Sequence, residues 1–97
     1  MALTVTTGTG NPLVVTGTTT TSDDIYTDSQ PVGLKFVYWY NPTTTGHLCN
    51  LIDGNGNAII KMRANSNNDT QMWPIFKFVE KIYCDDMDSG TLYLYLR

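Results

Sequence analysis

The sequence predicts an all-β protein: a small antiparallel β-sandwich of jelly-roll type, or a barrel, with an extended N-terminal arm. Three observations support this fold class. Apolar residues nowhere recur with the 3.6-residue period of a helix. Short stretches rich in β-branched and aromatic residues are separated by turn signals roughly every eight to twelve residues. Residues 91–97 alternate strictly between two faces, as a half-buried strand does.

The composition divides the chain of 97 residues after residue 32. Residues 1–32 are rich in Thr and Gly and hold three acidic residues but no Lys or Arg, so they carry the whole net charge of −3. Residues 33–97 are electrically balanced and dense in aromatic side chains. We interpret the first part as an arm with short strands and the second as a compact β domain. A polar arm buries too little apolar surface to offset the entropy lost when it becomes ordered. We therefore expect it to pack against another element, and an element of a different chain would be the most informative case.

Within the arm, residues 2–7 and 13–21 are β-prone, and residues 23–27 predict a third short strand. Gly17 interrupts the second stretch and indicates a bulge or a close backbone approach. An extended arm of this kind can add a strand to the exposed edge of another sheet. We expect its apolar side chains to make contacts with a partner, namely Leu3, Val5, Leu13, Val14 and Val15.

The compact part begins with residues 34–40, which are apolar on both faces and therefore predict a central strand covered on both sides. Residues 47–53 and 58–64 predict two strands of a hairpin. The intervening Asp-Gly-Asn-Gly-Asn segment, residues 53–57, supplies the positive φ angles that tight hairpin turns require.

Residues 73–79 predict an edge strand or an extended crossing, because Pro74 has no N–H to donate to a neighbouring strand. Residues 81–85 predict a further strand, and residues 91–97 predict the last one. In the last strand the leucines face the core, and the opposite face carries Tyr93, Tyr95 and Arg97. Tyr and Arg are enriched in interfaces, so we predict that this stripe is a second contact surface. We expect both tryptophans, Trp39 and Trp73, to lie mostly in the core.

The bulk properties argue against several function classes. A neutral compact part with few basic residues is a poor candidate for nucleic-acid binding. No apolar run approaches the length of a membrane span, and no export signal precedes the compact part. We therefore expect Cys49 and Cys84 to be buried free thiols, with a disulfide as the alternative if their strands are neighbours.

No catalytic or metal-binding motif is convincing. The turn at 53–57 begins like a calcium loop, but Ala58 stands where Gly is needed and Ala64 where a bidentate Glu is needed. His47 lacks the paired cysteines of a zinc site. The acidic residues at 85–88 cluster at a turn, where carboxylates are usually solvated. We expect a non-enzymatic protein without a cofactor or a metal.

From Gly33 onward the order of elements is distinctive: an aromatic strand at 36–39, a Thr/Gly loop at 43–47, a hairpin turn at 53–57 and a Ser-Gly-led strand at 88–96. This order resembles a group of small tailed-phage virion proteins of the capsid decoration (cement) type. The resemblance covers about two thirds of the chain and leaves the arm outside it.

The resemblance implies a structural protein of the virion that is made in the host cytoplasm and sits on the outer surface of the capsid. Its expected partners are the major capsid protein and two further copies of itself, in a homotrimer. Many weak contacts repeated by symmetry would give such a protein high avidity. Two alternatives stay open: a carbohydrate-binding module that holds host or mucosal glycans on the virion, and a neck or tail component with the same fold.

Overall fold

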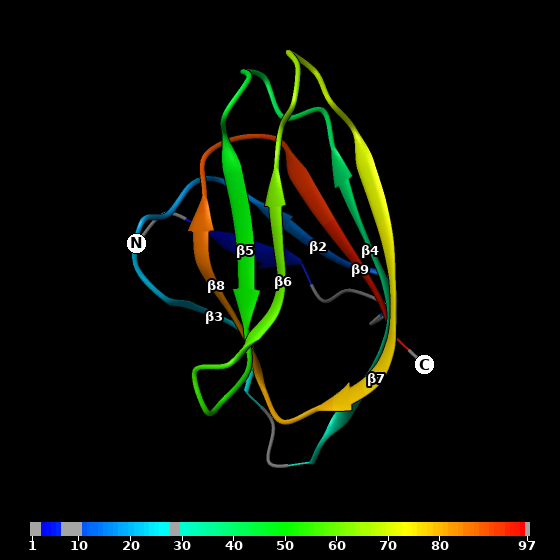
Figure 1. The fold of residues 1–97 in the computed structure, drawn as a ribbon. Coiled ribbons are helices and arrows are strands. Elements are labelled where there is room, and N and C mark those ends of the chain that lie inside the picture. Colours follow the sequence, from blue (N-terminus) through cyan, green and yellow to red (C-terminus); the bar gives the residue numbers. More distant parts are fainter. Residues whose placement is uncertain (1–2, 7–10, 28–29, 97) are drawn as a thin grey trace.

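The computed structural model describes residues 3–6, 11–27 and 30–96, which form an all-β globule without a helix (Figure 1). Two antiparallel sheets pack face to face, which confirms the predicted small β-sandwich. No described segment forms a helix long and apolar enough to cross a membrane. The strands are β1 (Thr4–Thr6), β2 (Leu13–Thr16), β3 (Asp23–Tyr26), β4 (Val32–Tyr40), β5 (Leu48–Ile52), β6 (Ala58–Arg63), β7 (Gln71–Val79), β8 (Ile82–Met87) and β9 (Thr91–Leu96).

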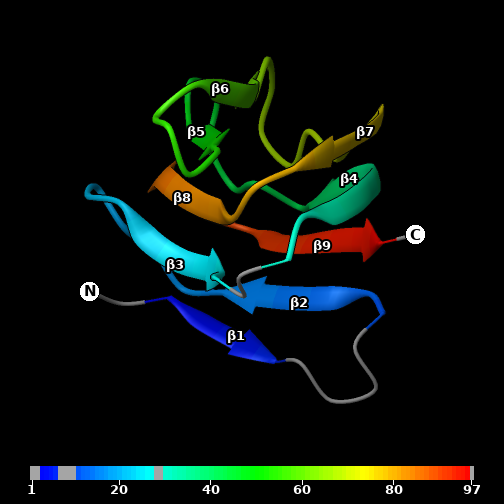
Figure 2. The ribbon, with the colours of Figure 1, turned by 90° about the horizontal axis from the view of Figure 1, so that it is seen from below.

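The strand order is β1-β2-β9-β4-β7 in the five-stranded sheet and β3-β8-β5-β6 in the four-stranded sheet. Figure 2 shows β1 and β3 at one border of the molecule and β6 and β7 at the opposite border. Each sheet therefore has one edge strand from residues 4–26 and one from residues 58–79.

The N-terminal segment is part of the sandwich rather than an arm that extends from it. Strand β2 pairs with the last strand, β9, and β3 pairs with β8 of the other sheet. These pairings cross the expected boundary at residue 32, so the strand topology shows no division there. Leu13 and Val15 point to the same face of β2 and are buried, so this face anchors the short strand on the core.

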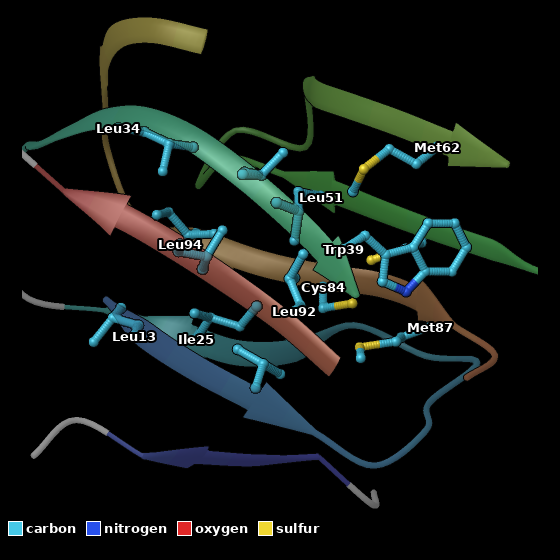
Figure 3. Close-up of a cluster of buried hydrophobic side chains, with 14 of the residues drawn as sticks. Leu13, Ile25, Leu34, Trp39, Leu51, Met62, Cys84, Met87, Leu92 and Leu94 are labelled. Atoms are coloured by element: carbon cyan, nitrogen blue, oxygen red, sulfur yellow. The ribbon is translucent and has the colours of Figure 1, made fainter. Parts of the chain in front are cut away.

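The core fills the space between the two sheets (Figure 3). Leu92 and Leu94 of β9 are fully buried, as the alternation predicts. Trp39 is fully buried as well, and its indole Nε1–H donates to the carbonyl oxygen of Ser89 at 2.9 Å. Because this donor is satisfied, the largest side chain of the core carries no unpaired polar group.

The turn between β5 and β6 confirms the hairpin prediction. One carboxylate oxygen of Asp53 accepts the backbone N–H groups of Asn55 at 2.9 Å and Asn57 at 3.0 Å. Gly56 has a φ of 82°, which a glycine adopts at little cost.

Strand β7 is an edge strand, as Pro74 predicts, and it is irregular. Its pairing with β4 shifts between Leu34↔Lys77 and Phe36↔Pro74, where Phe76 adopts a φ of 52°. The expectation that Trp73 lies mostly in the core is wrong, because 48% of its surface is exposed. On an outermost strand one flank of the ring has no neighbouring strand, and the indole N–H donates to the side chain of Gln71 at 3.0 Å instead.

Candidate interaction surface

The structure places three of the expected N-terminal contact residues in the core of their own chain. Leu3 and Leu13 are 4% exposed and Val15 is 0% exposed. Val15 lies opposite Leu92, and Leu13 lies opposite Leu94, so both side chains point between the sheets. Val5 is half-buried against the same core. Leu3, Leu13 and Val15 are therefore not available to a partner, because they hold the first strands onto the sandwich, whereas the partly exposed Val5 stays a predicted contact residue.

Val14 and the predicted Tyr stripe share the outer face of the five-stranded sheet. Val14 of β2 lies opposite Tyr93 of β9, and Tyr93 lies opposite Tyr38 of β4. Tyr95 lies opposite Phe36 in the next row. Val14, Tyr93 and Tyr95 are half-buried there. Arg97, the third member of the stripe, lies outside the described residues.

The outer side chains of β4 and β9 include five rings, which we call the aromatic face: Phe36, Tyr38, Tyr40, Tyr93 and Tyr95. Neighbouring ring centroids are 4.6 Å apart for Phe36 and Tyr95, and 5.7 Å apart for Tyr38 and Tyr93. Tyr40 continues the group at 6.1 Å from Tyr38 and is 48% exposed. The sequence indicated only the β9 half of this face. The apolar character of β4 on both sides suggested a strand covered on both sides, whereas its outer side chains Phe36 and Tyr38 are only half-buried and Tyr40 is exposed.

Strand β7 extends the apolar surface to the border of the molecule. Met72 lies opposite Tyr38 and so continues the aromatic face. Among the described residues, five large apolar side chains are exposed, and four of them belong to β7: Met72 at 61%, Trp73 at 48%, Phe76 at 61% and Phe78 at 65%. This exposed border could not be predicted from the sequence, because the order of residues within β7 does not indicate which side of the strand lacks a neighbouring strand.

Charged side chains are sorted between the two borders. All basic residues within strands lie toward the β6–β7 border, and all are exposed: Lys35, Lys61, Arg63 and Lys77. All acidic residues within strands lie on β3 and β8, toward the opposite border: Asp23, Asp24, Asp85 and Asp86. With the adjoining loops included, the β6–β7 side holds five basic side chains (Lys35, Lys61, Arg63, Lys77 and Lys81) and three acidic ones (Asp53, Asp69 and Glu80), so this border is net basic, whereas the border around β3 and β8 is acidic.

Asp86 is the most perturbed carboxyl group on the acidic side. It lies opposite Asn50 of β5, and one side-chain oxygen of each residue is buried without a hydrogen-bond partner. Burial raises the pKa of Asp86 to about 6, and the neighbouring Asp88 adds to the rise. Sequence reasoning treated these residues as turn acids in solvent, but Asp86 belongs to β8 and is half-buried.

The two thiols lie on neighbouring strands of the four-stranded sheet and are both fully buried. A hydrogen bond with the Cys84 thiol, followed by burial, raises the pKa of Cys49 well above its ordinary value. Since the thiolate is the reactive form, this position makes Cys49 a poor nucleophile.

The polar contacts around His47 serve the loops. Its Nδ1 lies 2.7 Å from the hydroxyl of Ser89, which also accepts the backbone N–H of Thr43 at 2.9 Å. These contacts join the loop after β4 to the turn before β9. In the part of the chain that the structure describes, no group of three His, Cys, Asp or Glu side chains could hold a metal ion.

Comparisons with protein-family models, curated proteins and solved structures give no match to this chain. Its function must therefore be argued from its surfaces.

Proposed function

We propose that this chain is a non-enzymatic structural protein of a tailed-phage virion, which decorates the capsid by binding the outer surface of the major capsid protein. The aromatic face is the observation that supports this proposal best. It presents five rings on two adjacent strands, together with the exposed Met72 at its border. Exposed apolar surface of this kind on a small protein marks a site of association.

The chemistry of the aromatic face suits a protein partner. Tyr and Phe are enriched in interface cores, and their rings lose little conformational entropy when they are covered. A rigid sheet presents the rings without reorganisation, which favours repeated binding to a symmetric shell. The proposed decoration protein assembles as a homotrimer, so each trimer would present three copies of this face.

The proposal is tested by adding the purified chain to capsids of the phage that encodes it, from which the chain has been removed. We expect sedimentation with the capsids, and at least roughly tenfold weaker binding for Tyr93→Ala. Thr20→Ala is the matched control, because Thr20 is exposed and lies outside the aromatic face. Capsids that bind neither wild type nor control would overturn the proposal.

A carbohydrate-binding module is the second candidate, and the half-exposed Tyr40 favours it. Its ring is tilted by 36° against that of Tyr38, so the two rings offer an angled platform on which a sugar could stack. A glycan array separates the two candidates: glycan binding that Tyr40→Ala removes supports this function, and an array without binding counts against it.

A neck or tail role would use the same fold and the same face in a single ring. Copy number in purified virions distinguishes it from decoration. We expect the number of copies to scale with the number of capsid subunits, whereas a neck component would be present only in one ring.

A further inference from the structure

We infer that copies of this chain associate head to tail, with the basic border of one copy, along β7, seated on the acidic border of the next copy, around β3. This inference rests on the self-association contained in the proposed function and names the surfaces that produce it. It does not depend on the capsid, so it can be tested with the purified chain alone.

The apolar side chains of β7 are the first argument. Trp73 and Phe76 are 48% and 61% exposed in the single chain. Phe76 also holds a φ of 52°, a region that large side chains rarely adopt. A bulky ring that is both exposed and conformationally strained weakens the isolated chain, and such strain is typical of sites with a function in binding. Contact with a partner would cover the ring.

The charge distribution selects the partner. The exposed Lys77 belongs to β7, and the exposed Lys61 and Arg63 belong to β6 at the same border, while Asp24 and Asp85 are exposed on the opposite border. A head-to-tail contact therefore joins opposite charges, which steers association and fixes orientation. A two-fold contact of β7 with β7 would instead bring two basic borders together. The two borders of this chain carry opposite charges, so a second copy of the same chain is the partner that we expect to bind at β7.

The backbone of β7 favours contact through side chains rather than a continuous intermolecular sheet. Pro74 has no N–H to donate, and the irregularity at Phe76 bends the edge. Strand β1, at the other end of the sheet, spans only Thr4–Thr6. Head-to-tail contacts of this kind close into a ring when the rotation between copies allows it, so they are compatible with a trimer.

The experiment is sedimentation velocity of the full chain over a range of concentrations, in low salt and in roughly 1 M salt, where the Debye length is about 3 Å. We expect an oligomer in low salt and weaker association in high salt. Asp24→Lys should weaken association roughly tenfold, and the double variant Lys77→Glu with Asp24→Lys should recover much of it. Asn55→Lys is the control. It also introduces a lysine, but at the exposed tip of the β5–β6 turn and away from the acidic border, so it should not weaken association.

Phe76→Asn separates association from folding. Asn tolerates a positive φ far better than Phe, so we expect the melting temperature of the monomer to rise by roughly 4 °C while association falls at least tenfold. An oligomer that Asp24→Lys leaves intact would overturn the head-to-tail contact but not the trimer. A wild-type chain that stays monomeric at every concentration would overturn both, while leaving capsid binding to be judged by its own test.

Discussion

At the scale of single residues, Gly90 shows how closely the turn before β9 is packed. It has a φ of 81°, and a Cβ added there would lie 2.7 Å from the carbonyl oxygen of Tyr40 and 3.0 Å from Nε1 of Trp39. We expect Gly90→Ala to lower the free energy of unfolding by about 3 kcal/mol, because backbone strain and a steric clash act together. Urea denaturation measures this loss.

Gly56 provides the matched control for that substitution. Its φ of 82° is nearly the same, but nothing lies within 4 Å of an added Cβ. Gly56→Ala should therefore cost only the conformational part, about 1 kcal/mol. Equal losses at the two glycines would contradict the role of the Tyr40 and Trp39 contacts.

A second residue-scale prediction concerns Asp86, whose pKa is raised from 3.8 to about 6. A carboxyl group with a raised folded-state pKa stabilises the fold fully below its ordinary pKa, and this contribution is lost as the pH rises through about 6. Asp86→Asn removes the charge and keeps the shape, so we expect it to stabilise the protein relative to wild type near neutral pH and progressively less toward acid. Urea denaturation at several pH values measures the difference in unfolding free energy. A difference that does not change with pH would contradict the assigned cause.

At the scale of elements, strand β2 tests whether residues before the compact part hold the fold together. Val15 is 0% exposed and faces Leu92, whereas Val14 is half-buried on the outer face. Val15→Ala should destabilise the protein by about 2 kcal/mol through a cavity, and Val14→Ala by less than about 1 kcal/mol. The comparison requires only two adjacent substitutions in one strand, measured by urea denaturation. Similar small losses for both would indicate that β2 adds little to the core.

The elements also show how far the sequence predicts this fold. Alternation predicted the buried face of β9, and the Gly- and Asn-rich turn predicted the β5–β6 hairpin, because both signals are local. The pairing of β2 with β9 joins the two ends of the chain, and no local signal specifies a contact of that range. The stripe at Tyr93 and Tyr95 could be predicted, because it depends on the local alternation of one strand. The exposed border at β7 depends on the strand order, which no local pattern specifies.

At the scale of the whole molecule, the two borders give the sandwich a polarity that its net charge conceals. Strand residues contribute four basic charges on one side and four acidic charges on the other, so the strands together are neutral while the borders are not. The net charge of −3 instead suggests a uniformly acidic protein. Polarity of this kind influences which faces meet during encounter, since long-range electrostatics steers association.

The whole molecule should also fold as one cooperative unit that includes its N-terminal strands. Deletion of residues 1–21 removes β1 and β2 and, with them, Leu3, Leu13 and Val15 from the core. At about 2 kcal/mol for each buried side chain, this loss is comparable to the 5–10 kcal/mol or so of total stability expected for a domain of this size. It would also uncover the flank of β9, where Leu92 and Leu94 are now fully buried. We therefore expect the truncated chain to lose the dispersed amide spectrum of a folded β protein in NMR. A truncated chain with native dispersion and unchanged unfolding free energy would mean that the segment is a detachable arm, and the core would then begin at β3.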